Sequence, residues 1–331
     1  MNTKEKAKSL WGAPKKFNSK ENDEERKVSW LELFYDLVYV IAIANITHHV
    51  ATHFNMDSLF SFLYFFVMIF WGWLNGSLYY DLHGSFGLRT KLVTLWQMLI
   101  VAALVVTLQG NLDHQTNSIT VVLMIMQLYI TYLWWSVGFY DKEHRKYSKP
   151  YIICYLITLC LICSTFFFEQ KYDFIILSIS LITNYIPPFI LHMRYRTSDF
   201  ELNLSSSMSE RLGLFTIIIF GELVIGVING TSAIASSDLW IWINFSLGIT
   251  IVFTLWWLFF TLVSDRACKN GLFNSSLLEI LYIPTLMALA LTGACFSKLF
   301  SYYIHHDHHL EWTTYGFGVS LVIYLFIYWE L

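Results

Sequence analysis

The first long apolar run of the chain opens with Trp30-Leu31-Glu32-Leu33-Phe34-Tyr35-Asp36-Leu37-Val38-Tyr39-Val40-Ile41-Ala42-Ile43. This stretch places two carboxylates, Glu32 and Asp36, in an otherwise apolar and aromatic segment. A charge at the centre of a bilayer costs roughly 2.5–3.5 kcal/mol on insertion scales, so such residues usually face the protein interior or an aqueous cavity. The stretch therefore predicts a membrane-spanning helix whose inner face is polar.

The composition extends this interpretation to the whole chain. Of the 331 residues, 56% are hydrophobic and only 14% are charged, whereas soluble proteins carry about 25% charged residues. The apolar residues fall in runs of about 20, the length that spans a hydrocarbon core as a helix. We count about ten such runs, at approximately 30–50, 58–80, 90–110, 117–139, 150–168, 172–192, 212–230, 239–263, 278–300 and 312–331. The predicted fold class is an all-α, polytopic helical membrane protein with about ten transmembrane helices.

Positive charge gathers on one side of these predicted spans. With the N-terminus inside, all of the 21 Lys and Arg except Lys171 and Lys298 fall on the cytoplasmic side, as the positive-inside rule requires. The segment 1–27 is polar and basic and lacks the apolar core of a signal peptide. We therefore expect a flexible cytoplasmic segment over 1–27, one transmembrane domain over 28–331, and a bilayer as the partner. Topology accounts for the basic residues, so no nucleic acid is expected; a homo-oligomer is left open.

Two sequence patterns recur in the same order. Phe34-Tyr35-Asp36-Leu37-Val38 resembles Phe220-Gly221-Glu222-Leu223-Val224, and Trp73-Leu74 with Asp81 resembles Trp257-Leu258 with Asp265. The spacing between copies is nearly the same for both. This predicts a parallel internal repeat of spans 1–4 and 7–10, with halves at about 28–200 and 205–331, as some transporter folds have. Chance similarity in an aromatic-rich sequence is the alternative.

Polar residues inside the spans predict an ion, proton or substrate pathway. Glu32 and Asp36 share one face of span 1, and Arg211, Glu222 and Asn229 share a stripe of span 7. We interpret Glu222 as the most deeply placed acid and expect a cation from another helix, such as Arg89 or Arg266, to pair with it. The full predicted set is Glu32, Asp36, Asn45, Arg89, Arg211, Glu222 and Asn229. The alternative is structural: a neutral acid that hydrogen-bonds across helices, and an interfacial role for Asp36.

Other features predict local geometry. Asn184 precedes Pro187-Pro188 in span 6, and a proline pair removes backbone donors and breaks or kinks a helix. Gly226 and Gly230 make a GxxxG pair, which is typical of close helix packing in membranes.

Histidines suggest a metal or pH-sensing site. His49 and His53 have ligand spacing on a helix, and His305, His306, His308 and His309 belong to one His-rich stretch. Such a set could bind zinc, copper or nickel, or respond to pH; an exposed, weakly binding loop is the alternative. No Walker loop, dinucleotide fingerprint, HExxH or GxSxG is present. The sequence therefore predicts no enzyme class and identifies no cofactor.

The carboxylate-bearing stretches resemble the bacterial low-temperature-requirement A family. The resemblance rests on Glu32-Leu33-Phe34-Tyr35-Asp36-Leu37-Val38-Tyr39-Val40 and on Glu210-Arg211-Leu212-Gly213-Leu214-Phe215 through Gly221-Glu222, with the Trp-rich end of span 2 before Arg89. It implies a multi-spanning bacterial inner-membrane protein whose members are linked to growth at low temperature. It implies no established reaction.

Two functions follow as hypotheses. The first is a secondary transporter or permease coupled to protons or cations through the intramembrane carboxylates, with a small molecule as a further candidate substrate. The alternative is a non-transporting sensor or scaffold for cold or envelope stress, whose outer His-rich loop responds to metal or pH.

Overall fold

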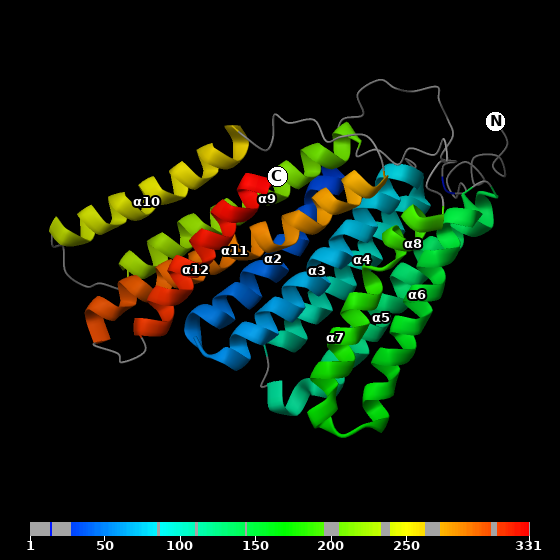
Figure 1. Ribbon diagram of the computed structural model, residues 1–331, viewed down its shortest axis with the longest axis horizontal. Helices are drawn as coiled ribbons and strands as arrows, with labels where there is room; N and C mark the ends of the chain where they lie inside the picture. The colour runs from blue at the N-terminus through cyan, green and yellow to red at the C-terminus, as the bar shows by residue number, and fades with distance from the viewer. Residues whose placement is uncertain are drawn as a thin grey trace. The chain divides into compact units, whose positions relative to one another are not determined.

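Helices form all the regular structure in the part of the chain that the computed structural model describes, namely residues 14, 28–84, 87–109, 112–142, 144–194, 205–232, 239–261, 272–305 and 310–330. The helices are α2 (Trp30–Thr52), α3 (Met56–His83), α4 (Leu88–Leu108), α5 (Leu112–Tyr140), α6 (Arg145–Ser164), α7 (Asp173–Asn184), α8 (Pro187–Arg194), α9 (Ser206–Ser232), α10 (Leu239–Phe259), α11 (Leu272–His305) and α12 (Leu310–Glu330). Two short 3₁₀ helices, η1 (Thr165–Phe167) and η2 (Gln170–Tyr172), join α6 to α7. Figure 1 labels the α-helices along the chain.

The predicted fold class is confirmed. Within the described ranges, 9 helical segments are long and apolar enough to cross a membrane, and Thr313–Ile327 of α12 forms a shorter apolar helix. The segment expected at 172–192 consists of two helices, α7 and α8, because α7 ends at Asn184 and α8 starts at Pro187. Proline is tolerated at the first position of a helix, where its missing N–H would have no partner. The internal repeat stays a prediction.

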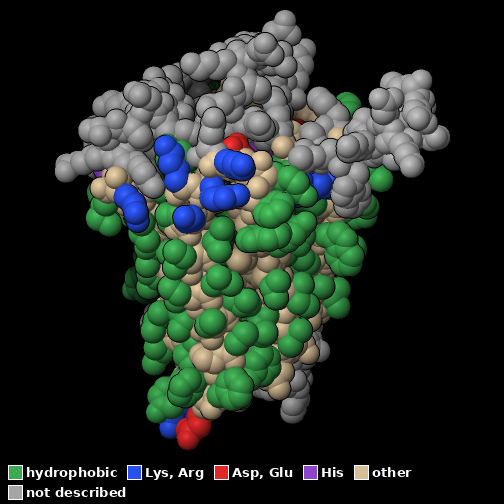
Figure 2. Space-filling view, turned by 90° about the vertical axis from the view of Figure 1, so that its right-hand side faces the viewer, with side chains coloured by type: hydrophobic (Ala, Val, Ile, Leu, Met, Phe, Trp, Pro, Cys, Tyr) green, Lys and Arg blue, Asp and Glu red, His purple; other side chains and the backbone are tan. Residues whose placement is uncertain are grey.

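The first half of helix α2 is apolar on its outer side and carries polar groups on its buried side. Its outward side chains recur at steps of three and four residues: Trp30, Phe34, Leu37 and Ile41. Its buried side chains include both acids and two tyrosines: Glu32, Tyr35, Asp36 and Tyr39. On the face shown in Figure 2, hydrophobic side chains cover the middle and Lys and Arg side chains gather at one end. A lipid bilayer is the solvent that matches such a surface.

The chain divides into two compact units, and helices α2, α3 and α9 each contribute to both. Unit 1 comprises Met1–Ala42 and Val67–Arg211; unit 2 comprises Ile43–Phe66 and Leu212–Leu331. In unit 1, α4 packs on α5, α5 on α6, and α6 on α7 (Figure 1). In unit 2, α11 packs on α12.

Polar side chains join the helices in the interior of unit 1. Asn75 accepts hydrogen bonds from the Trp134 indole (2.9 Å) and the Tyr155 hydroxyl (2.7 Å). The amides of Gln127 and Asn184 donate to each other at 3.0 and 3.1 Å, linking α5 to the end of α7. A buried polar group without a partner is costly, so these reciprocal contacts select which helices pack together.

Glycine permits a close helix contact in unit 2. A Cβ atom added to Gly226 of α9 would overlap the backbone carbonyl of Gly293 of α11. The close packing predicted at Gly226 therefore occurs against α11. By contrast, a Cβ atom at Gly221, on the same helix, would meet nothing within 4 Å.

We expect Gly226→Ala to lower the melting temperature of the detergent-purified protein, because α9 and α11 must separate to admit the methyl group. Gly221→Ala is the matched control. It should leave the melting temperature unchanged or raise it, since Ala stabilises a helix interior by roughly 0.5–1 kcal/mol relative to Gly. Equal effects of the two substitutions would show that the contact between Gly226 and Gly293 does not limit packing.

Candidate functional site

The site begins with the capping of α2. The backbone N–H and the hydroxyl of Ser29 both donate to Oε2 of Glu32 at 2.8 Å, and the backbone N–H of Glu32 donates to the Ser29 hydroxyl at 3.4 Å. This is a capping box, in which Ser and Glu three residues apart satisfy each other's backbone donors. It fixes the direction of the Glu32 side chain at the start of the helix.

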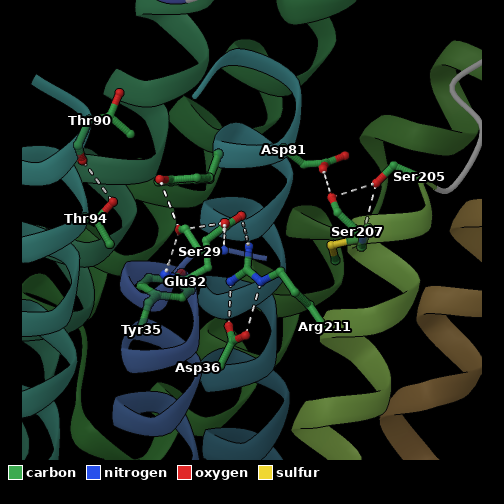
Figure 3. A network of polar contacts seen from close by, with 12 residues as sticks. Ser29, Glu32, Tyr35, Asp36, Asp81, Thr90, Thr94, Ser205, Ser207 and Arg211 are labelled. Carbon is green, nitrogen blue, oxygen red and sulfur yellow. Dashed lines mark hydrogen bonds and ion pairs between the residues drawn. The ribbon is translucent and has the colours of Figure 1, made fainter. Parts of the chain in front are cut away.

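One turn further along α2, the carboxylate of Asp36 binds Arg211 of α9. Arg211 donates from Nε to Oδ2 at 3.1 Å and from Nη2 to Oδ1 at 2.5 Å, and the indole of Trp73 donates to Oδ1 at 2.6 Å. Figure 3 shows Arg211 reaching from α9 toward both acids of α2. Bidentate charge-assisted pairs are among the strongest hydrogen-bonded contacts in proteins. Asp36 is thus held by three N–H groups.

Glu32 is the second acid in contact with Arg211. Its Oε1 lies 3.7 Å from Nη1, which is an ion pair but longer than a hydrogen bond. Glu32, Asp36 and Arg211 are each 1% exposed. We call these three residues the carboxylate–arginine cluster. With both acids ionised, it holds one more negative than positive charge.

A small cavity adjoins this cluster in unit 1. Its volume is about 10 Å³, and its wall includes Glu32, Tyr35, Gly76, Gln97 and Arg211. That volume is roughly what one water needs. Within the described residues, Nη1 of Arg211 has no hydrogen-bond acceptor. A Cβ atom at Gly76 would overlap the Tyr35 hydroxyl and the Gln97 amide, so glycine is required for the wall as observed.

Aromatic rings line the arginine. The guanidinium carbon of Arg211 lies 5.5 Å from the ring centroid of Tyr35 and 5.8 Å from that of Trp73. Both distances fall within the range of cation–π attraction. The Tyr35 hydroxyl in turn donates to the carbonyls of Gly72 and Trp73, each at 3.3 Å. The positive charge is therefore enclosed by two carboxylates and two ring faces.

The structure brings together three of the seven predicted pathway residues. Arg89 belongs to the same unit but donates to Ser136 at 3.1 Å and lies 5.0 Å from the ring centroid of Tyr140. The other three, Asn45, Glu222 and Asn229, belong to unit 2. Glu222 is only partly buried among the helices, and its depth along the span stays a prediction. A position near the middle of a span does not fix which way the side chain faces.

The predicted metal ligands are not assembled among the described side chains. The ring centroids of His49 and His53 are 5.3 Å apart, and His53 is exposed. His306, His308 and His309 lie outside the described residues, as do the side chain of His305 and all of Arg266. The described part of the chain contains no group of three or more His, Cys, Asp or Glu that could hold a metal ion. The metal site stays a prediction.

Sequence reasoning missed two neighbours of the cluster. Trp73 and Asp81 belong to the predicted repeat but not to the predicted site. The Ser207 hydroxyl donates to Oδ1 of Asp81, which ties the start of α9 to the end of α3 beside the cluster (Figure 3). The Ser-x-x-Glu pattern at Ser29 was the signal that could have located the capping box.

A buried histidine pair lies at the same end of unit 1. The rings of His83 and His144 are 4.8 Å apart and nearly perpendicular, and both are buried. Asp141 accepts a hydrogen bond from the His144 backbone N–H at 3.1 Å. Burial of the ring and the neighbouring His83 lower the pKa of His144 to about 3, and the charge of Asp141 opposes this shift only in part.

Comparisons with known proteins agree with the sequence resemblance. The family model described as "Bacterial low temperature requirement A protein (LtrA)" matches residues 27–330. The chain is also similar to an uncharacterized protein, RA0937, of Rhizobium meliloti (strain 1021), at 22% identity over 268 residues. That match covers 76% of this chain but 63% of the relative, so the chain spans less than two thirds of that protein's length. No solved structure matches the chain at a significant level.

We expect Asp36→Asn to lower the free energy of unfolding in detergent by about 3–5 kcal/mol, because Arg211 loses its bidentate contact in a buried site and keeps only the longer ion pair with Glu32, at 3.7 Å. Glu169→Gln is the control: Glu169 pairs with Lys171 at 2.5 Å, but their side chains are 73% and 62% exposed, and exposed pairs contribute little. Similar losses of unfolding free energy in Asp36→Asn and Glu169→Gln would show that the buried pair of Asp36 and Arg211 does not stabilise the fold.

We expect His144 to make the folded protein less stable in acid. Its folded pKa, about 3, lies below the usual value of about 6.5, so the unfolded chain binds the proton more readily. The contribution of His144 to stability is therefore complete above about pH 6.5 and is lost progressively as the pH falls toward 3. Melting temperatures between neutral and acidic pH should fall less steeply for His144→Gln than for the native chain. Identical slopes would show that His144 does not titrate in this range.

Proposed function

We propose that this chain, which belongs to the bacterial low temperature requirement A (LtrA) family, is a secondary transporter or permease coupled to protons or cations through the carboxylate–arginine cluster. One observation carries the proposal. Two carboxylates and one arginine are almost completely buried together in helices that are long and apolar enough to cross a membrane. Ionisable groups at such places commonly mark ion pathways and proton relays.

The charge of the cluster supports ion binding. Asp36 and Arg211 neutralise each other, and Glu32 adds a further negative charge in an apolar interior. Burying charged groups is costly even when they are paired. One proton or one monovalent cation at the cluster removes that charge. The loaded and empty forms then differ in free energy, and a coupled transporter needs such a difference to link ion binding to a change of conformation.

The geometry assigns different roles to the two acids. Asp36 accepts three N–H donors, so we propose that it positions Arg211. Glu32 has Oε2 engaged by Ser29, lies 3.7 Å from Arg211 through Oε1, and lines the small cavity. We propose that Glu32 takes the proton or cation, and that the cavity holds the water through which it arrives.

We further propose that this end of unit 1 faces the cytoplasm in a bacterial inner membrane. The contact between His83 and His144 brings the end of α3 beside the start of α6, where Arg145, Lys146 and Lys149 lie. The hydrogen bond between Ser207 and Asp81 brings the start of α9 to that same end of α3. Basic residues flanking spans favour the cytoplasmic side. The sequence pattern still favours three residues of unit 2 as further pathway candidates: Asn45, Glu222 and Asn229.

In proteoliposomes with an imposed pH gradient, we expect Glu32→Gln to abolish proton or cation flux, measured with an internal pH dye and a panel of monovalent cations. Glu169→Gln, at an exposed site, should transport like the native chain. Glu222→Gln in a parallel arm tests the predicted residue of unit 2. Flux that survives in a correctly folded Glu32→Gln protein would remove this residue from the mechanism.

Ser29→Ala separates ion binding from capping. This substitution removes the hydroxyl of the capping box but retains the Glu32 carboxylate. If Glu32 acts only as a cap, Ser29→Ala and Glu32→Gln should reduce stability and flux together. If Glu32 binds the ion, Ser29→Ala should lose about 1 kcal/mol of stability, as is usual for an N-cap, and keep its flux.

A further inference from the structure

Unit 2 contains a second and much larger cavity, with a volume of about 570 Å³. This lies within the range of about 300–1,000 Å³ found for small-molecule sites. Three helices and the segment before α3 supply its wall: Leu59 and Leu63 come from α3, Met287 and Leu291 from α11, and Val319 and Ile323 from α12.

The cavity is elongated along these helices. Its wall residues on α11 run from Pro284 to Cys295 and those on α12 from Tyr315 to Ile323. At 1.5 Å per residue, these stretches are about 16 Å and about 12 Å long. Ala288 and Cys295 are buried, whereas Tyr315 and Val319 are exposed. The cavity therefore runs from an open rim at α12 to a closed floor at α11.

The wall offers little to a polar ligand. The Ser320 hydroxyl bonds to the Phe317 carbonyl at 2.9 Å and to the Thr292 hydroxyl at 3.0 Å, so it is already engaged. The remaining polar side chains, Asn55 and Tyr315, lie together at one end. A Cβ atom at Gly316 would meet the Phe54 ring at 2.8 Å. The segment just before α3 therefore lies against the first turns of α12.

An apolar cavity of this size is not a stable empty space. Water needs two to four polar partners to occupy a buried site, and these walls do not provide them. An unfilled apolar volume also forfeits dispersion contacts of the atoms that line it. Helices α3 and α11 are long and apolar enough to cross a bilayer, and in a bilayer the molecules that reach an open apolar rim are lipids.

We propose that this cavity binds one acyl chain of a membrane phospholipid, with the chain along Leu59, Leu291 and Ile323 and the headgroup end beside Asn55 and Tyr315. The elongated shape fits a linear hydrocarbon better than a compact molecule. The two polar side chains at one end, Asn55 and Tyr315, set the direction in which the acyl chain would lie. The cavity shares no residue with the carboxylate–arginine cluster. The lipid proposal can therefore be tested separately from the proposed transport.

The test is photo-crosslinking of the full-length protein in phosphatidylcholine nanodiscs that contain a small fraction of phosphatidylethanolamine with a diazirine in its acyl chain. Labelled residues are mapped by peptide mass spectrometry. Val319→Trp, at the rim, should fill the opening. Val322→Trp is the matched control, because Val322 lies on the same helix, does not line the cavity, and is 66% exposed against 56% for Val319.

The expected result is labelling of the cavity wall that saturates as the fraction of photolipid rises, is lost in Val319→Trp, and persists in Val322→Trp. Lipid that merely surrounds the protein would label the exposed faces of α12 in proportion to its concentration. That outcome, or saturable labelling unaffected by Val319→Trp, would overturn the proposal. Saturable labelling by a free diazirine fatty acid but not by the phospholipid would overturn the choice of ligand. If Val319→Trp does not fold, the saturation curve of the native chain decides the question alone.

Discussion

The polar interior near the start of α2 depends on the pair between Asp36 and Arg211. These residues are 175 positions apart in the sequence, and neither is stable alone in an apolar interior, because an isolated buried ion is heavily penalised. Their bidentate contact, with Trp73 as a third donor to Asp36, pairs the two charges. It thereby joins α2, α3 and α9 within unit 1 and fixes the position of Glu32 one turn away.

The same reasoning explains why polar side chains organise a protein whose helices are mostly apolar. In lipid, apolar surfaces gain little by leaving their solvent, so helix association relies on close packing and interhelical hydrogen bonds. Asn75 and the amide pair of Gln127 and Asn184 supply such bonds in unit 1. Gly226 and Gly293 supply close packing in unit 2. Leu and Ile side chains at the surface set the depth of a helix in the membrane but not its neighbours.

The sequence was sufficient for the features that depend on one helix at a time. Span length, the inward direction of Glu32 and Asp36, and the interruption before Pro187 each follow from composition, periodicity or the chemistry of proline. Contacts between helices could not be derived in this way. Arg211 and Arg89 both carry a buried guanidinium, and nothing in the spacing of either shows which one meets Asp36. The partial burial of Glu222 could not be predicted for a related reason, since depth along a span says nothing about burial among helices.

The excess charge of the cluster is the feature that packing alone does not explain. Asp36 with Arg211 would make a neutral pair and would hold the same helices together. Capping does not require the extra acid either, because Gln serves at that position of a capping box as well as Glu does, and Gln carries no charge. Glu32 therefore adds a negative charge to the cluster that capping does not require. Within the cluster, Arg211 is bound by Asp36 at shorter distances than by Glu32. Because a proton or a mobile cation at Glu32 would change the charge of this buried cluster, the ion-coupled function is argued from Glu32.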